Sequence, residues 1–500
     1  MELGYLLEEI QGGVLDGDKA VEIKGIAYDS RNVQEGYLFV AIKGHSQDGH
    51  AYLNEAVSRG AAALVAENFE GLYTDIAKIK VLDSREALSK ISTRFYGDPC
   101  KDIEIIGITG TNGKTTTTYL IESVLSVAGA RPGVIGTINS RFQGNVRLSP
   151  VTTPESLELM EIIRGMADGG ATHVIIEVSS HALDQGRIGE CPFSVGVFTN
   201  FTRDHLDYHN TMDEYFRAKS ILFRELIKDR HGRKGVAIIN MDDPKGEVLC
   251  SMSKTDVLTY GLTGGCDIGA ENILTDKTGL KAIVRTPKGE AAISSSLIGR
   301  VNLYNILAAA AVAVSLDVDL DSIAQGIMEL KCVPGRLEKV NNKRGLTIVV
   351  DYAHTPDALI KAQETLKPLA MGRLITVFGC GGDRDRGKRP EMGIAAGKIS
   401  DIVFITSDNP RTEDPDEIIR QIEEGIKKTG MTSLDWKDDK IEGPGYFIEA
   451  DRHKAIEKAV SIAHVRDIVL IAGKGHEDYQ IVDKEKRFFD DRLEAAKAAS

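Results

Sequence analysis

Short runs rich in Val and Ile alternate along the chain with stretches in which apolar residues recur three and four positions apart. Four such runs, expected to be buried strands, lie at 103–108, 173–178, 195–199 and 236–239. Four more lie at 346–350, 374–378, 402–406 and 468–472, with helical patterns at 415–428 and 452–464 between them. Alternation of this kind is typical of parallel sheets in α/β proteins. The pattern therefore predicts two α/β domains.

The first hundred residues differ, because they lack a comparable series of long helices. We interpret them as a smaller, mixed α/β domain. Pro and Gly punctuate the sequence at 97–99 and again at 333–335, which favours boundaries there. The predicted domains are 1–98, 99–333 and 334–500, in keeping with roughly 150 residues per domain.

Charge and cysteine content exclude several classes of protein. Lys and Arg number 61 and Asp and Glu 74, so the net charge of −13 argues against sequence-blind binding to nucleic acid or anionic lipid. Six Cys show neither a CxxC nor a metal-ligand spacing. The N-terminus is acidic where an export signal needs basic residues, and the longest apolar run, 306–314, is about half of the ~18 residues of a membrane span. We expect a cytoplasmic protein that acts as a monomer. It should bind small molecules rather than nucleic acid and should not insert into a membrane.

A glycine-rich loop follows the strand at 103–108 and precedes a helical pattern. Its residues are Gly110, Thr111, Asn112, Gly113, Lys114, Thr115 and Thr116. In such a loop, backbone N–H groups approach phosphate oxygens, the lysine reaches the terminal phosphates and the hydroxyl after it can ligate Mg²⁺. Only two residues separate the glycines where four are usual. With a strand before it and a helix after it, the loop predicts a nucleotide site rather than a simple turn.

Polar residues also gather beyond other strand ends of the predicted central domain. Glu177 closes the run at 173–178, where a carboxylate can hold the Mg²⁺ of a nucleotide. A dense polar segment follows the next strand, at 199–209. Ser180, His181 and Asp184 are too close along the chain to form a nucleophile, a base and an orienting acid, and a GxSxG elbow is lacking. We therefore discount a serine hydrolase.

Three strand ends of the predicted third domain carry polar segments as well. The loop at 379–389 holds four cations against two acids, which makes a local anion site on an acidic protein. The segments 407–411 and 473–477 follow two other strands. Because the carboxyl ends of parallel strands meet at one edge of a sheet, these segments predict a single pocket.

Six motifs in order resemble the Mur ligase family: 109–115, 177–181, 199–209, 302–305, 334–336 and 351–356. The resemblance runs from Ser30 to Glu477. It implies a UDP-binding N-terminal domain, a central P-loop ATPase domain and a C-terminal Rossmann-like domain that brings an amino acid. It also implies that ATP phosphorylates a carboxylate of UDP-N-acetylmuramoyl-L-Ala-D-Glu, so that an amine can attack the acyl phosphate.

The same resemblance implies roles for individual residues. Lys114, Glu177, His205 and Lys219 would be catalytic. The loop residues 110–116 would bind ATP together with Asn302, Asn305, Arg336 and Asp351. Magnesium would be held by Thr115, Glu177, His205 and Lys219, the last as a carbamate. The UDP-linked substrate would contact Ser30, Thr152, Thr153, Ser179, Gln185 and Arg187.

The segment 408–411 resembles the version found in members that add meso-diaminopimelate. This amino acid is lysine with one more carboxylate, so its site needs a cation. Arg411 and Arg384 would supply it, Asp408 and Asn409 would fix the geometry, and Glu477 and the backbone at Gly473 would meet the distal ammonium. The alternatives are the same ligase using L-lysine, a ligase similar to folylpolyglutamate synthase, and a non-catalytic ATP-gated binding protein.

Overall fold

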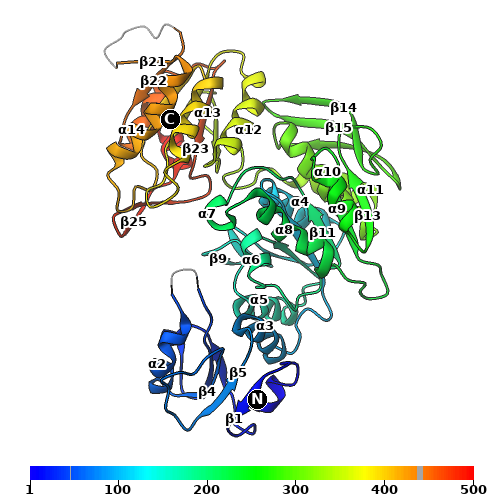
Figure 1. Ribbon diagram of the computed structural model, residues 1–500. Coiled ribbons are helices and arrows are strands. Elements are labelled where there is room, and N and C mark those ends of the chain that lie inside the picture. Colours follow the sequence, from blue (N-terminus) through cyan, green and yellow to red (C-terminus); the bar gives the residue numbers. More distant parts are fainter. Residues whose placement is uncertain (45–46, 436–442) are drawn as a thin grey trace.

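The computed structural model describes residues 1–44, 47–435 and 443–500 of the chain. Three parts follow one another along the molecule: an N-terminal part (blue), a central part (cyan and green) and a C-terminal part (yellow to red) (Figure 1). Each part contains its own sheet. The predicted α/β class, with a parallel-sheet central part, is confirmed. The domain boundaries at 98/99 and 333/334 stay predictions.

The N-terminal sheet has the strand order β1-β5-β4-β3-β2, in which only β1 is antiparallel to its neighbour. Helices α1 and α3 cover one face and α2 the other. Helix α3 begins where the Asp83 carboxylate accepts from the N–H groups of Arg85 and Glu86. The elements are α1 (Leu3–Leu6), β1 (Val14–Asp16), β2 (Gly25–Ala27), η1 (Ser30–Asn32), β3 (Tyr37–Val40), η2 (Gly49–Tyr52), α2 (Leu53–Ser58), β4 (Ala61–Ala66), β5 (Ala77–Lys80) and α3 (Ser84–Phe95).

The central sheet has the order β13-β12-β11-β6-β10-β7-β8-β9, and its first six strands are parallel. All four strands predicted for this domain lie in it. They are β6 (Glu104–Thr109), β10 (His173–Glu177), β11 (Val195–Phe198) and β12 (Val236–Asn240); the others are β7 (Pro132–Ile135), β8 (Asn139–Phe142), β9 (Asn145–Leu148) and β13 (Asp256–Tyr260). Strand β6 lies between β10 and β11, which brings the ends of these three strands together.

Helices cover both faces of the central sheet. One face packs on α4 (Lys114–Val127), α10 (Arg300–Ser315) and α11 (Leu320–Glu329). The apolar run at 306–314 lies in α10, whose residues there are buried. The other face packs on α5 (Ser156–Asp168), α6 (Ser180–Asp184), α8 (Met212–Ile221), the π-helical turn η3 (Leu222–Leu226) and α9 (Gly246–Met252), with α7 (Leu206–His209) nearby.

An antiparallel sheet of β14 (Gly269–Asp276), β15 (Gly279–Thr286) and β16 (Gly289–Ser295) adjoins the central part. Its inward residues, such as Leu280, Val284 and Ile293, join the core of α10 and α11. The α/β pattern of the sequence did not predict this sheet, because its strands alternate buried and exposed residues rather than forming apolar runs.

The C-terminal sheet has the order β17-β18-β23-β19-β20-β22-β21, parallel except for β17. It contains the four predicted strands as β18 (Thr347–Asp351), β19 (Leu374–Phe378), β20 (Ile402–Ile405) and β23 (Ile468–Ala472), besides β17 (Glu338–Lys339), β21 (Thr432–Ser433) and β22 (Gly445–Ile448). One face packs on α12 (Pro356–Leu366), α13 (Lys388–Ile399) and α14 (Pro415–Ile426), the other on α15 (Arg452–Ser461) and α16 (Asp491–Ala498). Turns η4 (Lys367–Leu369) and η5 (Lys427–Thr429) end α12 and α14.

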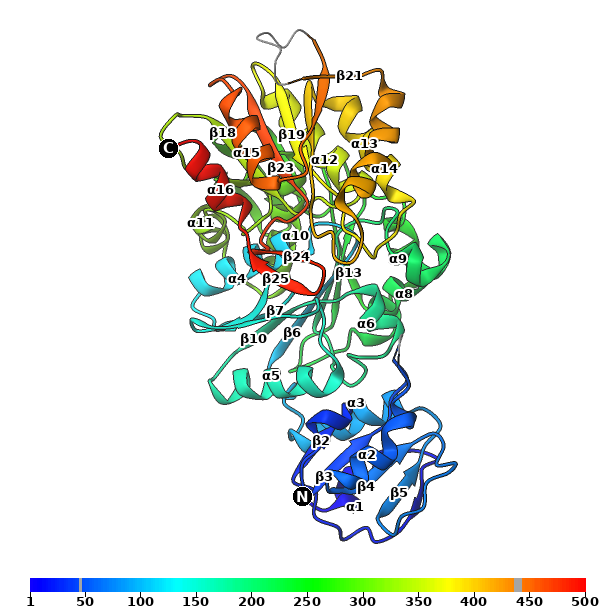
Figure 2. The ribbon, with the colours of Figure 1, turned by 90° about the vertical axis from the view of Figure 1, so that its left-hand side faces the viewer.

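A hairpin of β24 (Tyr479–Val482) and β25 (Glu485–Phe488) projects from the C-terminal part toward the central part (Figure 2). It is tied to the loop after β20, because the Arg411 N–H donates to the Ile481 carbonyl at 3.1 Å and the Asp483 N–H donates to the Arg411 carbonyl at 2.7 Å. These bonds hold Arg411 at φ +53°. In the described part of the chain, the structure contains no helix that is both long and apolar enough to cross a bilayer.

Candidate active site

The glycine-rich loop joins β6 to α4, as predicted. At Gly110 the backbone has φ +143°, and a Cβ there would lie 1.9 Å from the Thr199 hydroxyl, so only glycine fits. The Lys114 ammonium donates to the carbonyls of Gly110 and Thr111 at 2.8 and 2.9 Å. Burial lowers the pKa of Lys114. The loop thus places a lysine at the N-terminus of a helix, which is the arrangement that binds phosphate.

Glu177 ends β10 beside this loop and is buried. Its carboxylate accepts from the Thr115 hydroxyl at 2.9 Å and from both the N–H and the hydroxyl of Thr137, at 3.0 and 2.9 Å. A hydroxyl and a carboxylate are oxygen ligands of the kind that Mg²⁺ prefers, and Mg²⁺ takes its other ligands from water and phosphate. The described residues contain no cluster of three or more His, Cys, Asp or Glu side chains suited to a metal. The donor set at Thr115 and Glu177 therefore fits a nucleotide-bound Mg²⁺ rather than a metal held by protein alone.

Lys219 projects from α8 toward the same loop and is buried. Its ammonium donates to the Gly110 carbonyl at 2.9 Å and lies 4.5 Å from the centre of the Tyr215 ring. Burial, and then the nearby Lys114, hold the pKa of Lys219 well below its ordinary value. A lowered pKa favours the neutral amine, which is the form that can react with carbon dioxide.

His205 lies on the other side of the loop, at φ +53°. Its ring centre is 4.8 Å from that of His181. Burial lowers the pKa of His205 to about 4, although Asp204 beside it acts in the opposite direction. The imidazole is neutral at physiological pH, so it has a nitrogen lone pair available to a ligand.

The residues expected on the nucleotide come from two parts of the chain. Asn305 lies against the loop, where its Oδ1 accepts from the Thr117 hydroxyl at 3.4 Å, and its Nδ2 donates to Asn302 at 3.0 Å. Arg336 comes from the C-terminal part and donates to the Thr115 hydroxyl at 3.2 Å. The Arg336 Nε is buried and has no protein partner among the described residues. A buried donor of this kind suits an anionic ligand.

Asp351 ends β18 near Arg336. Its carboxylate accepts from the N–H groups of Leu337 and Ala353, at 2.7 and 2.8 Å. Burial raises the pKa of Asp351, while the Arg336 charge acts to lower it.

Most residues expected on the UDP-linked substrate form one cluster. The Ser179 N–H donates to the Thr153 hydroxyl at 3.0 Å, and Arg187 donates to the Thr153 carbonyl at 3.1 Å. Arg187 also donates to the Gln185 amide oxygen at 2.9 Å, and the Thr152 hydroxyl lies 3.2 Å from that of Thr137. Ser30 stays apart in the N-terminal part, where its hydroxyl donates to Glu55 at 3.0 Å.

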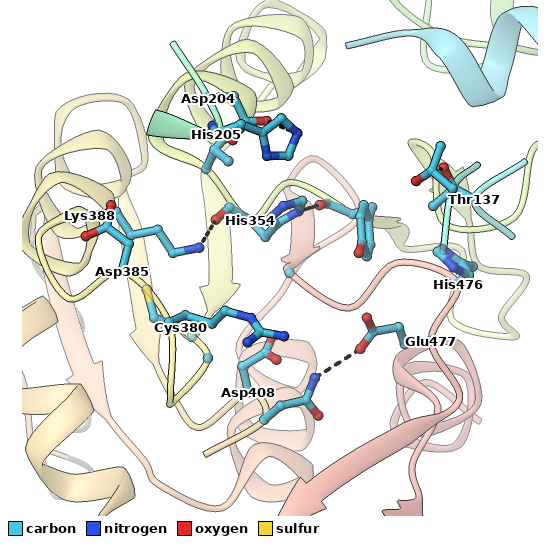
Figure 3. Close-up of a pocket in the computed structure, with 18 of the residues that line it drawn as sticks. Thr137, Asp204, His205, His354, Cys380, Asp385, Lys388, Asp408, His476 and Glu477 are labelled. Carbon is cyan, nitrogen blue, oxygen red and sulfur yellow. Dashed lines mark hydrogen bonds and ion pairs between the residues drawn. The ribbon is translucent and has the colours of Figure 1, made fainter. Parts of the chain in front are cut away.

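A cavity of about 990 Å³ lies between the central and C-terminal parts. The central part lines it with Thr137, Thr152, Asp204 and His205, and the C-terminal part with residues from three strand ends (Figure 3). These are the predicted residues Arg384, Asp408, Asn409, Arg411, Gly473 and Glu477. The three polar segments thus form a single pocket, as predicted, and Thr137, which binds Glu177, lines it from the central part.

Contacts between these segments are close. The Asn409 amide donates to the Glu477 carboxylate at 3.0 Å, and Arg411 donates to the Gly382 carbonyl at 2.8 Å. Gly473 has φ +116°, and a Cβ there would lie 2.7 Å from the Asp408 carboxylate. Burial and the neighbouring Arg384 lower the pKa of Arg411, although its guanidinium stays charged. Two arginines so close together favour a ligand that brings a carboxylate.

The sequence analysis missed several residues of this cavity. Thr137, which binds Glu177, follows the short apolar run of β7 and could have been found from its position at a strand end. His354 and Lys388 also line the cavity, and the Lys388 ammonium donates to the His354 carbonyl at 3.2 Å (Figure 3). Both lie inside segments already noted, but the sequence holds no signal that separates them from their neighbours.

Comparisons with known proteins agree on one family. Residues 108–313 match the Mur ligase middle domain, residues 335–475 the Mur ligase glutamate ligase domain, and residues 22–96 the Mur ligase family catalytic domain. A relative from Geobacter sulfurreducens, named UDP-N-acetylmuramoyl-L-alanyl-D-glutamate--2,6-diaminopimelate ligase, is 47% identical over 100% of this chain and 98% of its own. A Geobacillus kaustophilus protein of the same name is 42% identical over 100% and 99%. A solved structure of a ligase of that name has a TM-score of 0.68 and 33% identity, covering 100% of this chain and 99% of that one.

Proposed function

Because the chain belongs to the Mur ligase family, we propose that it joins meso-diaminopimelate to UDP-N-acetylmuramoyl-L-Ala-D-Glu at the expense of ATP. The product is the UDP-muramoyl-tripeptide used in peptidoglycan synthesis. Residues 1–98 would bind the UDP end, 99–333 ATP, and 334–500 the amino acid. The observation that carries the proposal is one cavity that His205 and Thr137, the partner of Glu177, line from the central part and Arg384 and Arg411 line from the C-terminal part.

The first step of the proposed reaction is transfer of the γ-phosphoryl group of ATP to the free γ-carboxylate of the D-glutamyl residue. Lys114 would leave the carbonyls of Gly110 and Thr111 to bind the phosphates. Arg336, with an unpaired Nε, would add a second cation from the C-terminal part. Asn302 and Asn305 would bind the adenine side, and Asp351 would contact the nucleotide from the C-terminal part. A bound Mg²⁺, held by Thr115, Glu177, His205 and the modified Lys219, would neutralise phosphate charge.

The second step is attack on the acyl phosphate by the amine of diaminopimelate. An amine does not attack a carboxylate anion at a useful rate, so phosphate must first become the leaving group. The attacking amine must be unprotonated, and its nitrogen must be placed for attack on the carbonyl carbon. The amino-acid pocket would provide this by holding the far end of the molecule, so that the reacting end points toward the glycine-rich loop.

We propose that Lys219 carries a carbamate. A buried ammonium beside Lys114 and a metal ion would be repelled, whereas a carbamate is an anionic oxygen ligand. Burial of Lys219 favours the neutral amine that the modification requires.

The distal end of diaminopimelate has one carboxylate and one ammonium group. Arg411, with Arg384 beside it, would bind the carboxylate through a planar fork. Glu477 and the backbone at Gly473 would bind the ammonium, and Asp408 and Asn409 would fix the geometry of the pocket.

The UDP-linked substrate would reach across the N-terminal and central parts. Thr152, Thr153, Ser179, Gln185 and Arg187 would meet its peptide end near Glu177. Ser30 would meet the uridine. Because ATP and a nucleotide-linked sugar are cytoplasmic compounds, we propose that the protein works in the cytoplasm, as a monomer.

The experiment that tests this function follows ADP release and product mass with purified protein, ATP, Mg²⁺, UDP-muramoyl-dipeptide and meso-diaminopimelate. ADP should form steadily only when all the substrates are present. With ¹⁸O in the D-glutamyl γ-carboxylate, one ¹⁸O should appear in the released phosphate. One carboxylate oxygen bridges carbon and phosphorus in the acyl phosphate and leaves with the phosphate when the amine attacks. ADP release without the UDP-peptide, or phosphate free of ¹⁸O, would contradict the proposal.

A further inference from the structure

Lys474 is a buried cation next to the amino-acid pocket, and the proposed reaction does not use it. It follows β23 and its side chain has no exposed surface. Its ammonium donates to the Asn409 Oδ1 at 3.0 Å and lies 3.6 Å from the Glu477 carboxylate and 5.6 Å from the centre of the Tyr479 ring. Burying a charge costs free energy unless partners compensate it, so these contacts stabilise the buried Lys474.

The first contact fixes the orientation of the Asn409 amide. Its Oδ1 accepts from Lys474 and also from the Ile481 N–H at 2.9 Å. Since Lys474 and a backbone N–H are donors only, the oxygen must face them. The Nδ2 then points to Glu477, to which it donates at 3.0 Å (Figure 3 shows this bond at Glu477). Lys474 therefore orders the two side chains that line the pocket at this point.

The second contact compensates the charge of Glu477. Burial raises the pKa of Glu477, and Lys474 is the first of the groups that lower it. The charged and titratable groups facing Glu477 come from the loops after β18, β20 and β23, from β24 and from α15: Tyr352, Asp408, Arg411, Lys474, Tyr479 and Arg452. Among the described cations, Lys474 is the one that forms an ion pair with Glu477, at 3.6 Å.

We propose that Lys474 is a positioning residue for the incoming amino acid: it keeps Glu477 ionised so that this carboxylate can receive a distal ammonium group, and it turns the Asn409 amide so that the amide donates to the same carboxylate and fixes its position. It need not touch the substrate itself. The inference rests on the proposed function and goes one step beyond it, since it names the group that makes Glu477 an anion. A ligand with a cationic far end is the class of compound that such a pair recognises.

The test compares Lys474→Met, which removes the charge and keeps the length, with Lys428→Met, which removes an exposed lysine of the same part. In the full-length enzyme, the KM for diaminopimelate should rise roughly 30-fold or more in Lys474→Met, as expected when one partner of a buried charge pair is lost. The KM values for ATP and UDP-peptide should change less than about twofold, and kcat should fall far less than the amino-acid KM rises. Lys428→Met should match the unmutated enzyme.

A pH series separates positioning from a loss of structure. Without Lys474, Glu477 should titrate at a higher pH, so the ratio of the two KM values, variant over unmutated, should fall as pH rises from 7 to 9. A loss of packing has no reason to be relieved by base. A KM ratio that stays constant with pH, or equal changes in all three KM values, would overturn the proposal.

A second comparison covers the case in which Lys474→Met alone does not fold. Glu477→Gln should raise the amino-acid KM, and Lys474→Met/Glu477→Gln, in which neither partner of the pair is charged, should have an amino-acid KM close to that of Glu477→Gln. A double variant whose KM lies far above that of Glu477→Gln would mean that Lys474 acts independently of Glu477, which would overturn the inference. If the unmutated enzyme shows no amino-acid-dependent ADP release, the proposed function fails instead.

Discussion

The guanidinium of Arg336 donates a hydrogen bond of 3.2 Å to the hydroxyl of Thr115. The first residue belongs to the C-terminal part and the second to the glycine-rich loop of the central part, so the nucleotide site is assembled from both. Asp357 of the C-terminal part also contacts the central part. Its carboxylate accepts from Thr202 at 2.8 Å and from Asn112 at 3.3 Å. Substitutions in the loop should therefore act on phosphoryl transfer and leave distant substrate contacts intact.

Replacing Lys114 by alanine should abolish phosphoryl transfer while UDP-peptide binding remains, because Ser30 and the Thr153 cluster are separate from the loop. The loss should reach about 3 kcal/mol or more in the transition state. ADP release and calorimetric binding of the UDP-peptide measure the two effects. Lys101→Ala, which removes an exposed lysine, is the control. Near-normal turnover in Lys114→Ala would show that the site is assigned wrongly.

Replacing Lys219 by alanine should remove most of the activity, because the anionic ligand proposed at this position is lost. A short carboxylic acid added to the variant should restore part of it by occupying the vacated space. Mass spectrometry under native conditions should also show a labile carbon dioxide adduct on the unmutated protein. Full activity of the alanine variant would contradict the carbamate role.

The buried pair of Arg452 and Asp491 should make a large difference to stability. Arg452 donates to the Asp491 carboxylate at 2.8 and 2.6 Å, and also to the carbonyls of Ser407 and Ala472 at two strand ends of the pocket. Asp491→Ala leaves the cation buried without its partner and should cost about 3–5 kcal/mol in the free energy of unfolding. Arg452→Met/Asp491→Leu should be less destabilised, as judged by urea denaturation. A double variant with a lower free energy of unfolding than Asp491→Ala would contradict this.

Acid should weaken the contact between the start of α13 and the loop after β20. Glu413 binds the buried Arg389 at 2.8 and 3.0 Å, and this hydrogen bonding lowers the pKa of Glu413 to about 2. A carboxyl whose pKa is lowered in the folded state stabilises the fold above its ordinary pKa of 4.5, and this contribution is lost as the pH falls toward 2. Glu413→Gln should therefore lower Tm at pH 7 and have progressively less effect between pH 4.5 and 2. A Tm difference that does not shrink with acid would contradict it.

The sequence predicted the strands that carry the site because buried parallel strands are nearly continuous apolar runs, and because polar residues follow them. The loop at 110–116, Glu177 and the three polar strand ends of the C-terminal part were all found in this way. The periodicity also predicted α14 and α15 to within a few residues, and a helix directly after the glycine-rich loop, where α4 lies.

The supporting contacts were not predictable, because they join residues that are far apart in the sequence and have no signature of their own. Arg389 and Glu413 are 24 positions apart, and Arg452 and Asp491 are 39 apart. Charged side chains are rarely fully buried in proteins, yet Arg452 and Lys474 both are. Only the fold shows which charges have been enclosed.

The most direct test of the account is the ratio of kcat/KM for meso-diaminopimelate to that for L-lysine, measured with the unmutated enzyme and with Arg411→Ala. Lysine lacks the distal carboxylate and would leave the arginines of the pocket unpaired, and sites of this kind reject such analogues by up to ~10⁴ to 10⁵. The ratio should lie in that range for the unmutated enzyme. Arg411→Ala should lose about 2–5 kcal/mol of transition-state stabilisation for diaminopimelate. Equal kcat/KM for the two amino acids would contradict it.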